Sequence, residues 1–226
     1  MESGLLVHLD AANPKSYPGS GTTWFDVSGA ARDSTLVNGV SYNSQGFMTF
    51  DETLSQSVSV PLGSLLTAIT DTMTIECWAY FPSNSTWTSA NNSGLFARGS
   101  IGGSHGLFRS ATNNVILSYY RGTVSGAAGV TSAVGRDAWY HLLSTWNGVD
   151  TTQLYINGDL RGSNTAAVTG GFDTGSFLLG ANNRPGGTIN GSFFTGSLNG
   201  CRIYDRVLTD AEVKQNFEAA RSKYGI

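Results

Sequence analysis

The stretch Trp139–Gly162, which reads WYHLLSTWNGVDTTQLYINGDLRG, decides the fold. Two runs rich in β-branched and aromatic residues, Tyr140–Trp146 and Thr152–Ile156, are typical of strands. An Asn-Gly pair follows each run, at Asn147-Gly148 and at Asn157-Gly158. Asn-Gly favours positive φ at both central positions of a type I′ turn, whose twist matches that of paired strands. The stretch therefore predicts a β-meander and an antiparallel β class.

Outward from this meander, alternating apolar and polar residues predict further strands. In Thr72–Phe81 one face carries only apolar side chains, which are Met73, Ile75, Cys77, Ala79 and Phe81. A strand with one apolar face is typical of a sandwich core. We expect the remaining strands at Leu5–Leu9, Gly46–Phe50, Gln56–Val60 and residues 94–98, 106–109, 114–121, 139–146, 152–156, 176–179 and 198–204.

The C-terminus changes to a helical period. Thr209 is a helix-capping residue, and Glu212 three positions later completes a capping box. Apolar residues then recur at helical spacing, at Val213, Phe217, Ala220 and Tyr224. This pattern predicts an amphipathic helix over residues 209–222 that ends before Gly225.

Length and composition favour a single sandwich domain over residues 1–226. Glycine accounts for 29 of the 226 residues, charged residues for 13% and hydrophobic residues for 40%. This balance suits many short strands joined by turns and is too apolar for a disordered chain. The net charge of −3 argues against binding to nucleic acid or to an anionic membrane, since either would require a basic face.

The two cysteines and the N-terminus indicate where the chain folds. Cys77 and Cys201 each lie in an apolar, strand-like run. Buried free thiols are favoured over a disulfide, because one pair does not make a disulfide scaffold. Residues 1–20 lack the basic and apolar regions of a signal peptide, and no run approaches the ~20 apolar residues of a membrane span. We therefore expect folding in a cytosol.

Several motifs carry a resemblance to a known family. W-Y-H at Trp139–His141 and L-Y-I-N-G at Leu154–Gly158 form its most specific block. Further matching segments are F-D at 50–51, M-T-I-E-C-W-A-Y at 73–80, F-L-L-G at 177–180, G-S-L-N-G-C-R-I-Y-D-R-V-L at 196–208 and T-D-A-E at 209–212. Together they resemble a laminin-G-like domain of the concanavalin A-like lectin/glucanase superfamily. The resemblance implies a β-sandwich jelly roll with a short C-terminal helix.

The N-terminal segment His8–Gly29 is similar to a variant frequent among structural proteins of tailed phages. The resemblance therefore implies a virion protein that assembles in a host cytoplasm. Most of the matching motifs occupy core and turn positions, so they identify the fold better than the ligand.

Because the superfamily includes glucanases, the residues must be tested for glycosidase chemistry. A retaining glycosidase needs two carboxylates about 5–5.5 Å apart, which requires acidic residues two or four positions apart on one strand face. The five glutamates are Glu2, Glu52, Glu76, Glu212 and Glu218. None has such a partner on a predicted strand, so the sequence predicts a protein that is not an enzyme.

The sequence requires no cofactor. The histidines are scattered, at His8, His105 and His141, and no Cys or His stands at metal-ligand spacing. The resemblance leaves one structural Ca²⁺ open, because relatives bind this ion through loop carboxylates and backbone carbonyls. The candidate ligands are Asp10, Asp26 and Asp51. Each also suits a plain turn-forming role, and Asn199 stands where relatives often carry an aspartate in the closing strand.

A run of basic residues marks a candidate ligand site. Residues 1–97 carry eight acidic residues against Lys15 and Arg32. Residues 98–136 carry no acidic residue. They contain Arg98, His105, Arg109, Tyr119, Tyr120, Arg121 and Arg136. Arginine forks and aromatic faces suit sugars and carboxylates. The alternative is that solvent-facing strand positions simply need polar side chains.

Two other features bear on function. Trp87, Arg184 and Phe193-Phe194 lie in predicted loops and could join a binding rim, although a subunit interface explains the phenylalanines equally well. The sequence predicts non-catalytic recognition of a host glycan by a virion surface or tail-associated protein. The alternative is a structural virion subunit, a capsid decoration or tail-assembly protein, that makes only protein contacts and self-associates. No nucleic acid or membrane partner is expected.

Overall fold

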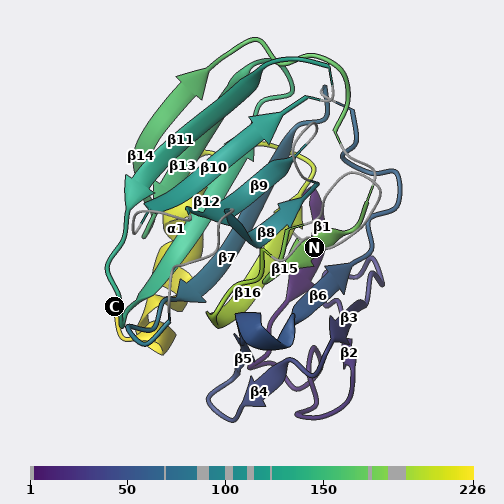
Figure 1. The fold of residues 1–226 in the computed structure, drawn as a ribbon, viewed down its shortest axis with the longest axis vertical. Coiled ribbons are helices and arrows are strands. Elements are labelled where there is room, and N and C mark those ends of the chain that lie inside the picture. The colour runs from purple at the N-terminus through teal and green to yellow at the C-terminus, as the bar shows by residue number, and fades with distance from the viewer. Residues whose placement is uncertain are drawn as a thin grey trace.

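The fold is a sandwich of two antiparallel sheets, as the sequence predicts. A computed structural model describes residues 3–68, 70–85, 92–99, 104–110, 115–122, 124–172, 175–182 and 192–226. In these residues each sheet has eight strands. Figure 1 shows the two sheets stacked face to face, with the one α-helix of the described residues behind them.

Sheet A has the strand order β14-β13-β12-β7-β16-β5-β4, and β1 also pairs with β16. Its strands are β14 (Asp159–Thr165), β13 (Thr151–Ile156), β12 (Trp139–Trp146), β7 (Met73–Tyr80), β16 (Gly196–Tyr204), β5 (Phe47–Phe50), β4 (Ser41–Asn43) and β1 (Leu5–Leu9). The predicted meander therefore forms one side of this sheet.

Sheet B has the order β11-β10-β9-β8-β15-β6-β3-β2. Its strands are β11 (Ala127–Ala133), β10 (Val115–Arg121), β9 (His105–Arg109), β8 (Ser93–Arg98), β15 (Phe177–Leu179), β6 (Ser57–Val60), β3 (Ser34–Val37) and β2 (Thr23–Trp24). The 3₁₀ turn η1 (Glu52–Leu54) joins β5 to β6 and crosses between the sheets.

One hydrophobic core fills the space between the sheets. Apolar side chains from both sheets are fully buried in it, among them Ile75, Ile203 and Trp146. Cys77 and Cys201 are free thiols in this core, as the sequence favours. Burial raises the pKa of both thiols, because a thiolate would lose its hydration there.

The C-terminal helix covers the outer face of sheet A. Helix α1 (Asp210–Ala220) begins with the predicted capping box between Thr209 and Glu212, and η2 (Arg221–Tyr224) continues it. Val213 packs with Leu143, Tyr155 and Tyr204 on that face. None of the helices described here has the length and hydrophobicity needed to cross a lipid bilayer.

The two Asn-Gly turns differ. Asn157 and Gly158 both have positive φ, at 56° and 77°, which confirms the type I′ prediction for this hairpin. At the other pair the prediction is wrong, because only Gly148 has positive φ. Asn147 Oδ1 instead accepts hydrogen bonds from the backbone N–H groups of Val149, Asp150 and Thr151, which stabilise a longer loop.

The Gly158→Val variant is expected to lower the free energy of unfolding by about 1–3 kcal/mol. A β-branched residue is strained at a φ of 77°, and a Cβ there would lie 3.1 Å from the Cβ of Phe217 on α1. Urea denaturation measures the change. Leu160→Val, at an exposed position of the same hairpin, is the control and should be close to neutral. A Gly158→Val protein as stable as the parent would rule out the type I′ turn.

Candidate functional site

Three of the predicted ligand residues lie inside the sandwich. Arg98, His105 and Arg109 are at most 1% exposed, because the strand register places them opposite inward-facing residues of neighbouring strands. Arg98 donates to the carbonyl oxygens of Leu65 and Leu66, at 2.8 and 3.2 Å. In this structure these three side chains contribute to the interior and do not reach the outer face of sheet B.

His105 and Arg109 have partners within the interior. The His105 ring lies 4.3 Å from the ring of Phe172, centroid to centroid. Arg109 Nη2 donates to Ser93 Oγ at 2.9 Å. Burial lowers the pKa of Arg109, because desolvation disfavours its charged form.

The adjacent tyrosines of β10 point in opposite directions, as strand alternation requires. Tyr120 is fully buried, stacks on Trp146 at 5.2 Å and accepts a hydrogen bond from Ser144 Oγ. Burial raises the pKa of Tyr120. Tyr119 and Arg121 lie on the other face of the strand and are half-buried. This outward pair is called the β10 strip below.

Glycines surround the aromatic ring of the β10 strip. Tyr119 pairs with Gly106 of β9 and with Gly129 of β11. A Cβ at Gly129 would lie 3.1 Å from Tyr119 Cδ2, so a larger residue there would crowd the ring. Phe108 meets Tyr119 edge-on at 6.4 Å. The ring therefore lies beside the bare backbone of Gly129, with Arg121 two residues away on the same face.

The predicted loop residues have different positions. Trp87 and Arg184 lie outside the described residues. Phe194 is fully buried in the core against Phe50 and Phe81, and Phe193 is 8% exposed and packs in a separate small cluster with Leu178 and Ala181.

The three candidate calcium ligands do not share a site. Among the residues that the structure describes, no three His, Cys, Asp or Glu side chains group around one point. Asp26 accepts hydrogen bonds from the backbone of His8 and Asp51 caps η1 through Thr53. Asp10 pairs with Lys223 at 3.1 Å. A Ca²⁺ held by all three carboxylates does not fit this arrangement, and a Ca²⁺ at any one of them stays a prediction.

A buried charged cluster, which the sequence pattern does not predict, lies under the helix. Glu76 is fully buried on the outer face of β7, where Arg202 Nη1 lies 2.6 Å from its Oε1 and His141 Nε2 lies 3.1 Å away. Asn216 of α1 donates to Oε2 at 2.7 Å. Burial alone would raise the pKa of Glu76, but attraction to Arg202 and the contacts with His141 and Asn216 outweigh it and hold the pKa at about 2.

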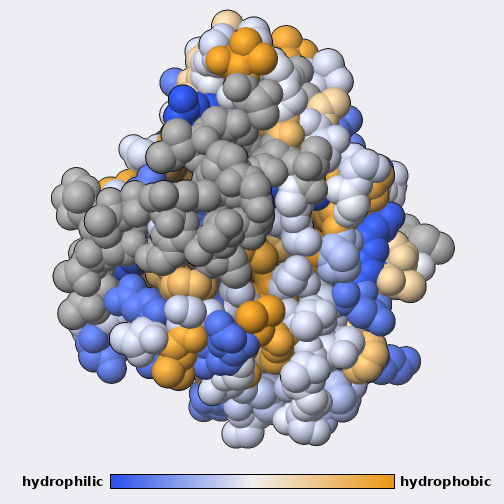
Figure 2. All heavy atoms as spheres, turned by 45° about the vertical axis from the view of Figure 1, so that its right-hand side comes forward, coloured by the Kyte–Doolittle hydropathy of each residue, from blue (hydrophilic) through white to orange (hydrophobic). Residues whose placement is uncertain are grey.

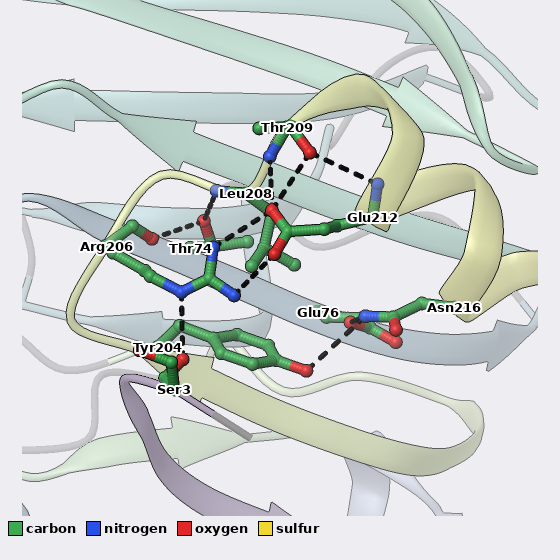
Figure 3. A network of polar contacts seen from close by, with 9 residues as sticks. All are labelled: Ser3, Thr74, Glu76, Tyr204, Arg206, Leu208, Thr209, Glu212 and Asn216. Atoms are coloured by element: carbon green, nitrogen blue, oxygen red, sulfur yellow. Dashed lines mark hydrogen bonds and ion pairs between the residues drawn. The ribbon is translucent and has the colours of Figure 1, made fainter.

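A second polar network anchors the start of the helix (Figure 3). Arg206 forms two hydrogen bonds to the Glu212 carboxylate, at 2.7 and 2.9 Å, and a third to the carbonyl of Ser3. Thr74 of β7 donates to the carbonyl of Arg206 and accepts from the N–H of Leu208. Both networks join α1 to sheet A, so they fix the walls of any cavity between the two.

Two cavities lie beside η2. The larger, of about 340 Å³, is lined by residues that include Asp10, Gly200, Arg202, Asn216, Ala219 and Tyr224. The smaller, of about 200 Å³, is lined by Gln45, Phe47, Trp139, Lys223 and Tyr224. The feature of the sequence that could have pointed to this region is the apolar stripe of the predicted helix. Such a stripe packs against a sheet, and here it covers the face of β7 that carries Glu76 and Trp78.

Solved structures share this fold. Domain 4 of AbnA, an extracellular GH43 arabinanase from Geobacillus stearothermophilus, was solved with arabinotriose. It superposes with a TM-score of 0.68 at 17% identity, over 96% of this chain and 99% of that one. The binding domain of Paraclostridial Mosquitocidal Protein 1 gives 0.67 at 15% identity, over 96% and 52%. The botulinum neurotoxin serotype G binding domain gives 0.69 at 14% identity, over 96% and 51%. At these identities the likeness establishes the fold.

Sequence comparisons identify the family. Human pentraxin-related protein PTX3 is 32% identical over 84 residues, which are 34% of this chain and 22% of that protein. This chain thus spans about a fifth of its length. Residues 51–214 match a laminin G model for the concanavalin A-like lectin/glucanases superfamily, and because the match covers most of the chain, the protein belongs to that superfamily.

Proposed function

We propose that this protein is a non-catalytic module that recognises carbohydrate through the β10 strip on the outer face of sheet B. The observation that carries the proposal is the half-exposed Tyr119 ring between two glycines, with Arg121 on the same face. An aromatic face suits the apolar side of a sugar ring. A guanidinium binds a carboxylate or sulfate through two parallel hydrogen bonds, so the preferred ligand is an acidic glycan.

The named relatives support a binding role. The toxin structures are binding domains, and domain 4 of the arabinanase was solved with an arabinose oligosaccharide. The position of Glu76 also favours a non-catalytic protein. This carboxylate is buried under α1 and held by Arg202 and Asn216, so it cannot reach a substrate.

The setting proposed for this module is the surface or tail of a virion, where it would bind a host glycan. The support is the resemblance of His8–Gly29 to tailed-phage proteins. The rival is a structural virion subunit with only protein contacts. In Figure 2, the apolar residues on the coloured part of the visible face form small groups between polar ones. A stable protein interface usually needs a broader apolar patch than the groups seen in this view.

Binding to acidic and neutral polysaccharides, measured by calorimetry at low and high salt, tests the proposal. Tyr119→Ala and Arg121→Gln should each weaken binding of the acidic glycan about tenfold or more, the usual effect of losing a charge-assisted hydrogen bond or an aromatic contact. High salt should weaken it further, because exposed charges are screened. Arg161→Gln, at an exposed position on sheet A, is the matched control and should bind like the parent.

Two outcomes would contradict the proposal. If both β10 variants bind like the parent, the site is elsewhere. If the parent binds no glycan and instead self-associates or binds a virion scaffold, the structural-subunit function takes its place. Tyr120→Ala separates folding from binding, because it should lower stability through lost contacts with Trp146.

A further inference from the structure

The two cavities beside η2 adjoin one another on the outer face of sheet A. Lys223 and Tyr224 line both cavities, so the two cavities are neighbours that share part of their walls. We call the pair of cavities the η2 groove. Figure 1 shows sheet B in front of sheet A and α1 behind sheet A, so the groove and the β10 strip lie on opposite sides of the sandwich.

The charges of the η2 groove are balanced by internal pairs. Lys223 Nζ lies 3.1 Å from Asp10 Oδ1, and Arg202 Nη1 lies 2.6 Å from Glu76 Oε1. An anionic ligand would have to compete with these carboxylates. A neutral ligand with several hydroxyl groups meets donors and acceptors together, because amide and charged side chains both line the larger cavity.

The smaller cavity adds an aromatic wall. Trp139 is partly buried and meets Phe47 at 5.1 Å and Tyr224 at 4.9 Å, centroid to centroid. Gln45 lines the same cavity and supplies an amide beside the rings. Apolar faces beside a hydrogen-bonding amide suit the two sides of a pyranose ring, one of C–H groups and one of hydroxyls.

A β-bulge shapes the floor of the larger cavity. The pairing of β16 with β7 shifts between Asn199 and Arg202, and Gly200 in the bulge has a φ of 57°. A Cβ at Gly200 would lie 3.0 Å from Trp78 Cδ1, so this position stays bare and the floor stays open. Bulges are frequent beside binding sites, where they redirect neighbouring side chains.

Asn199 fixes the two sides of the groove. Its Nδ2 donates to Asp10 Oδ1 at 3.2 Å and to the Tyr224 hydroxyl at 3.1 Å. Its Oδ1 accepts from the N–H of Ala11 at 2.7 Å. Buried contacts to Tyr224 and Ala11 and a partly buried contact to Asp10 thus fix the walls of the groove, as in a pre-formed site.

We infer that the η2 groove binds a short neutral oligosaccharide, with one sugar unit in the larger cavity and the next against Trp139. This is a second site, separate from the β10 strip, and it does not depend on the function proposed for that strip. Its ligand is uncharged, so its affinity does not fall with salt, and it gains from a second sugar unit because two cavities are available.

The test uses glucose, maltotriose, cellotriose and mannotriose as probes, with binding measured by saturation-transfer NMR and calorimetry. At least one trisaccharide should bind more tightly than glucose, equally at low and high salt. Ala219→Trp should weaken this binding about tenfold or more by filling the larger cavity. Ala219 is an exposed helix position that lines this cavity, so the fold tolerates the change. Ala211→Trp, exposed on the same helix away from the groove, is the matched control.

The outcomes separate this site from the β10 strip. Tyr119→Ala should leave trisaccharide binding unchanged, and Ala219→Trp should leave binding of the acidic glycan unchanged. The inference is overturned if none of the trisaccharides binds, if Ala219→Trp binds like the parent, or if Tyr119→Ala abolishes binding of the trisaccharide. In each of these cases an acidic glycan can still bind at the β10 strip.

Discussion

Replacing Glu76 by glutamine is expected to lower the free energy of unfolding by about 3–5 kcal/mol, the cost of removing one partner of a buried ion pair. The carboxylate is fully buried, and Arg202, His141 and Asn216 all face it. A neutral amide would leave the Arg202 guanidinium, which is only 18% exposed, without its anion. Glu218→Gln is the control, because its pairs with Lys214 and Arg221 are exposed and contribute less than about 1 kcal/mol.

The same substitution should change how stability depends on pH. The pKa of Glu76 falls from 4.5 to about 2 on folding, so its stabilisation is fully present above pH 4.5 and is lost as the pH falls towards 2. The linked free energy is about 3 kcal/mol. Urea denaturation between pH 6 and pH 2 measures it, where the parent should lose more stability than Glu76→Gln. Parallel curves for the two proteins would mean that folding does not change the pKa of Glu76, and a parent that gains stability relative to Glu76→Gln on acidification would mean that the folded state keeps this carboxyl protonated.

The second large effect is expected in the core. Ile75→Ala should lower the free energy of unfolding by about 2–5 kcal/mol, through lost burial and the cavity left behind. Ile75 is fully buried in β7 and pairs with Ser144 on one side and Ile203 on the other, at the centre of sheet A. Ile75→Val should cost only about 0.5–1.5 kcal/mol. A denaturation midpoint that does not move in Ile75→Ala would remove this strand from the core.

Strands with strong alternation or a marked apolar run could be predicted from the sequence. The predicted segments around Ile75, Tyr140–Trp146 and Thr152–Ile156 all form strands close to their expected bounds. The strands that the sequence does not predict, β2, β3, β4, β11 and β14, carry weaker signals. β11 is made of small residues and β14 of polar ones, and each lies at the end of its sheet's strand order. Edge strands need to bury little apolar surface, so the alternation of apolar and polar residues along them is weak.

The candidate site was harder to predict, because the basic run predicts arginine side chains that reach a ligand at the surface. The register shows otherwise: Arg109 pairs with Ile116 and His105 with Tyr120, both of which point into the core. Only Tyr119 and Arg121 of that set lie on the outer face of β10. The inward arginines donate to backbone carbonyls and hydroxyls, as Arg98 does to Leu65 and Leu66 and Arg109 to Ser93, and single-sequence patterns do not reveal such partners.

The buried ion pair of Glu76 could not be predicted from the sequence for a related reason. Its partners are distant in sequence, since Arg202 lies on β16 and Asn216 on α1. Local periodicity places Glu76 on the outer face of β7 but does not say what covers that face. The apolar stripe of the C-terminal helix was the available clue, and Val213 and Phe217 do pack over the outer face of sheet A.

The position of β16 has a consequence for how the chain reaches its native state during synthesis. This strand pairs with β1, β5 and β7. These three earlier strands of sheet A therefore cannot complete their hydrogen bonding until residues 196–204 have been synthesised. Such long-range pairing gives a high contact order and slow folding. Until then β7 has an open edge, and Glu76 has neither Arg202 nor Asn216 beside it. A nascent chain that stalls before residue 205 is therefore expected to aggregate or to engage chaperones, and folding is expected to complete only after β16 has left the ribosome.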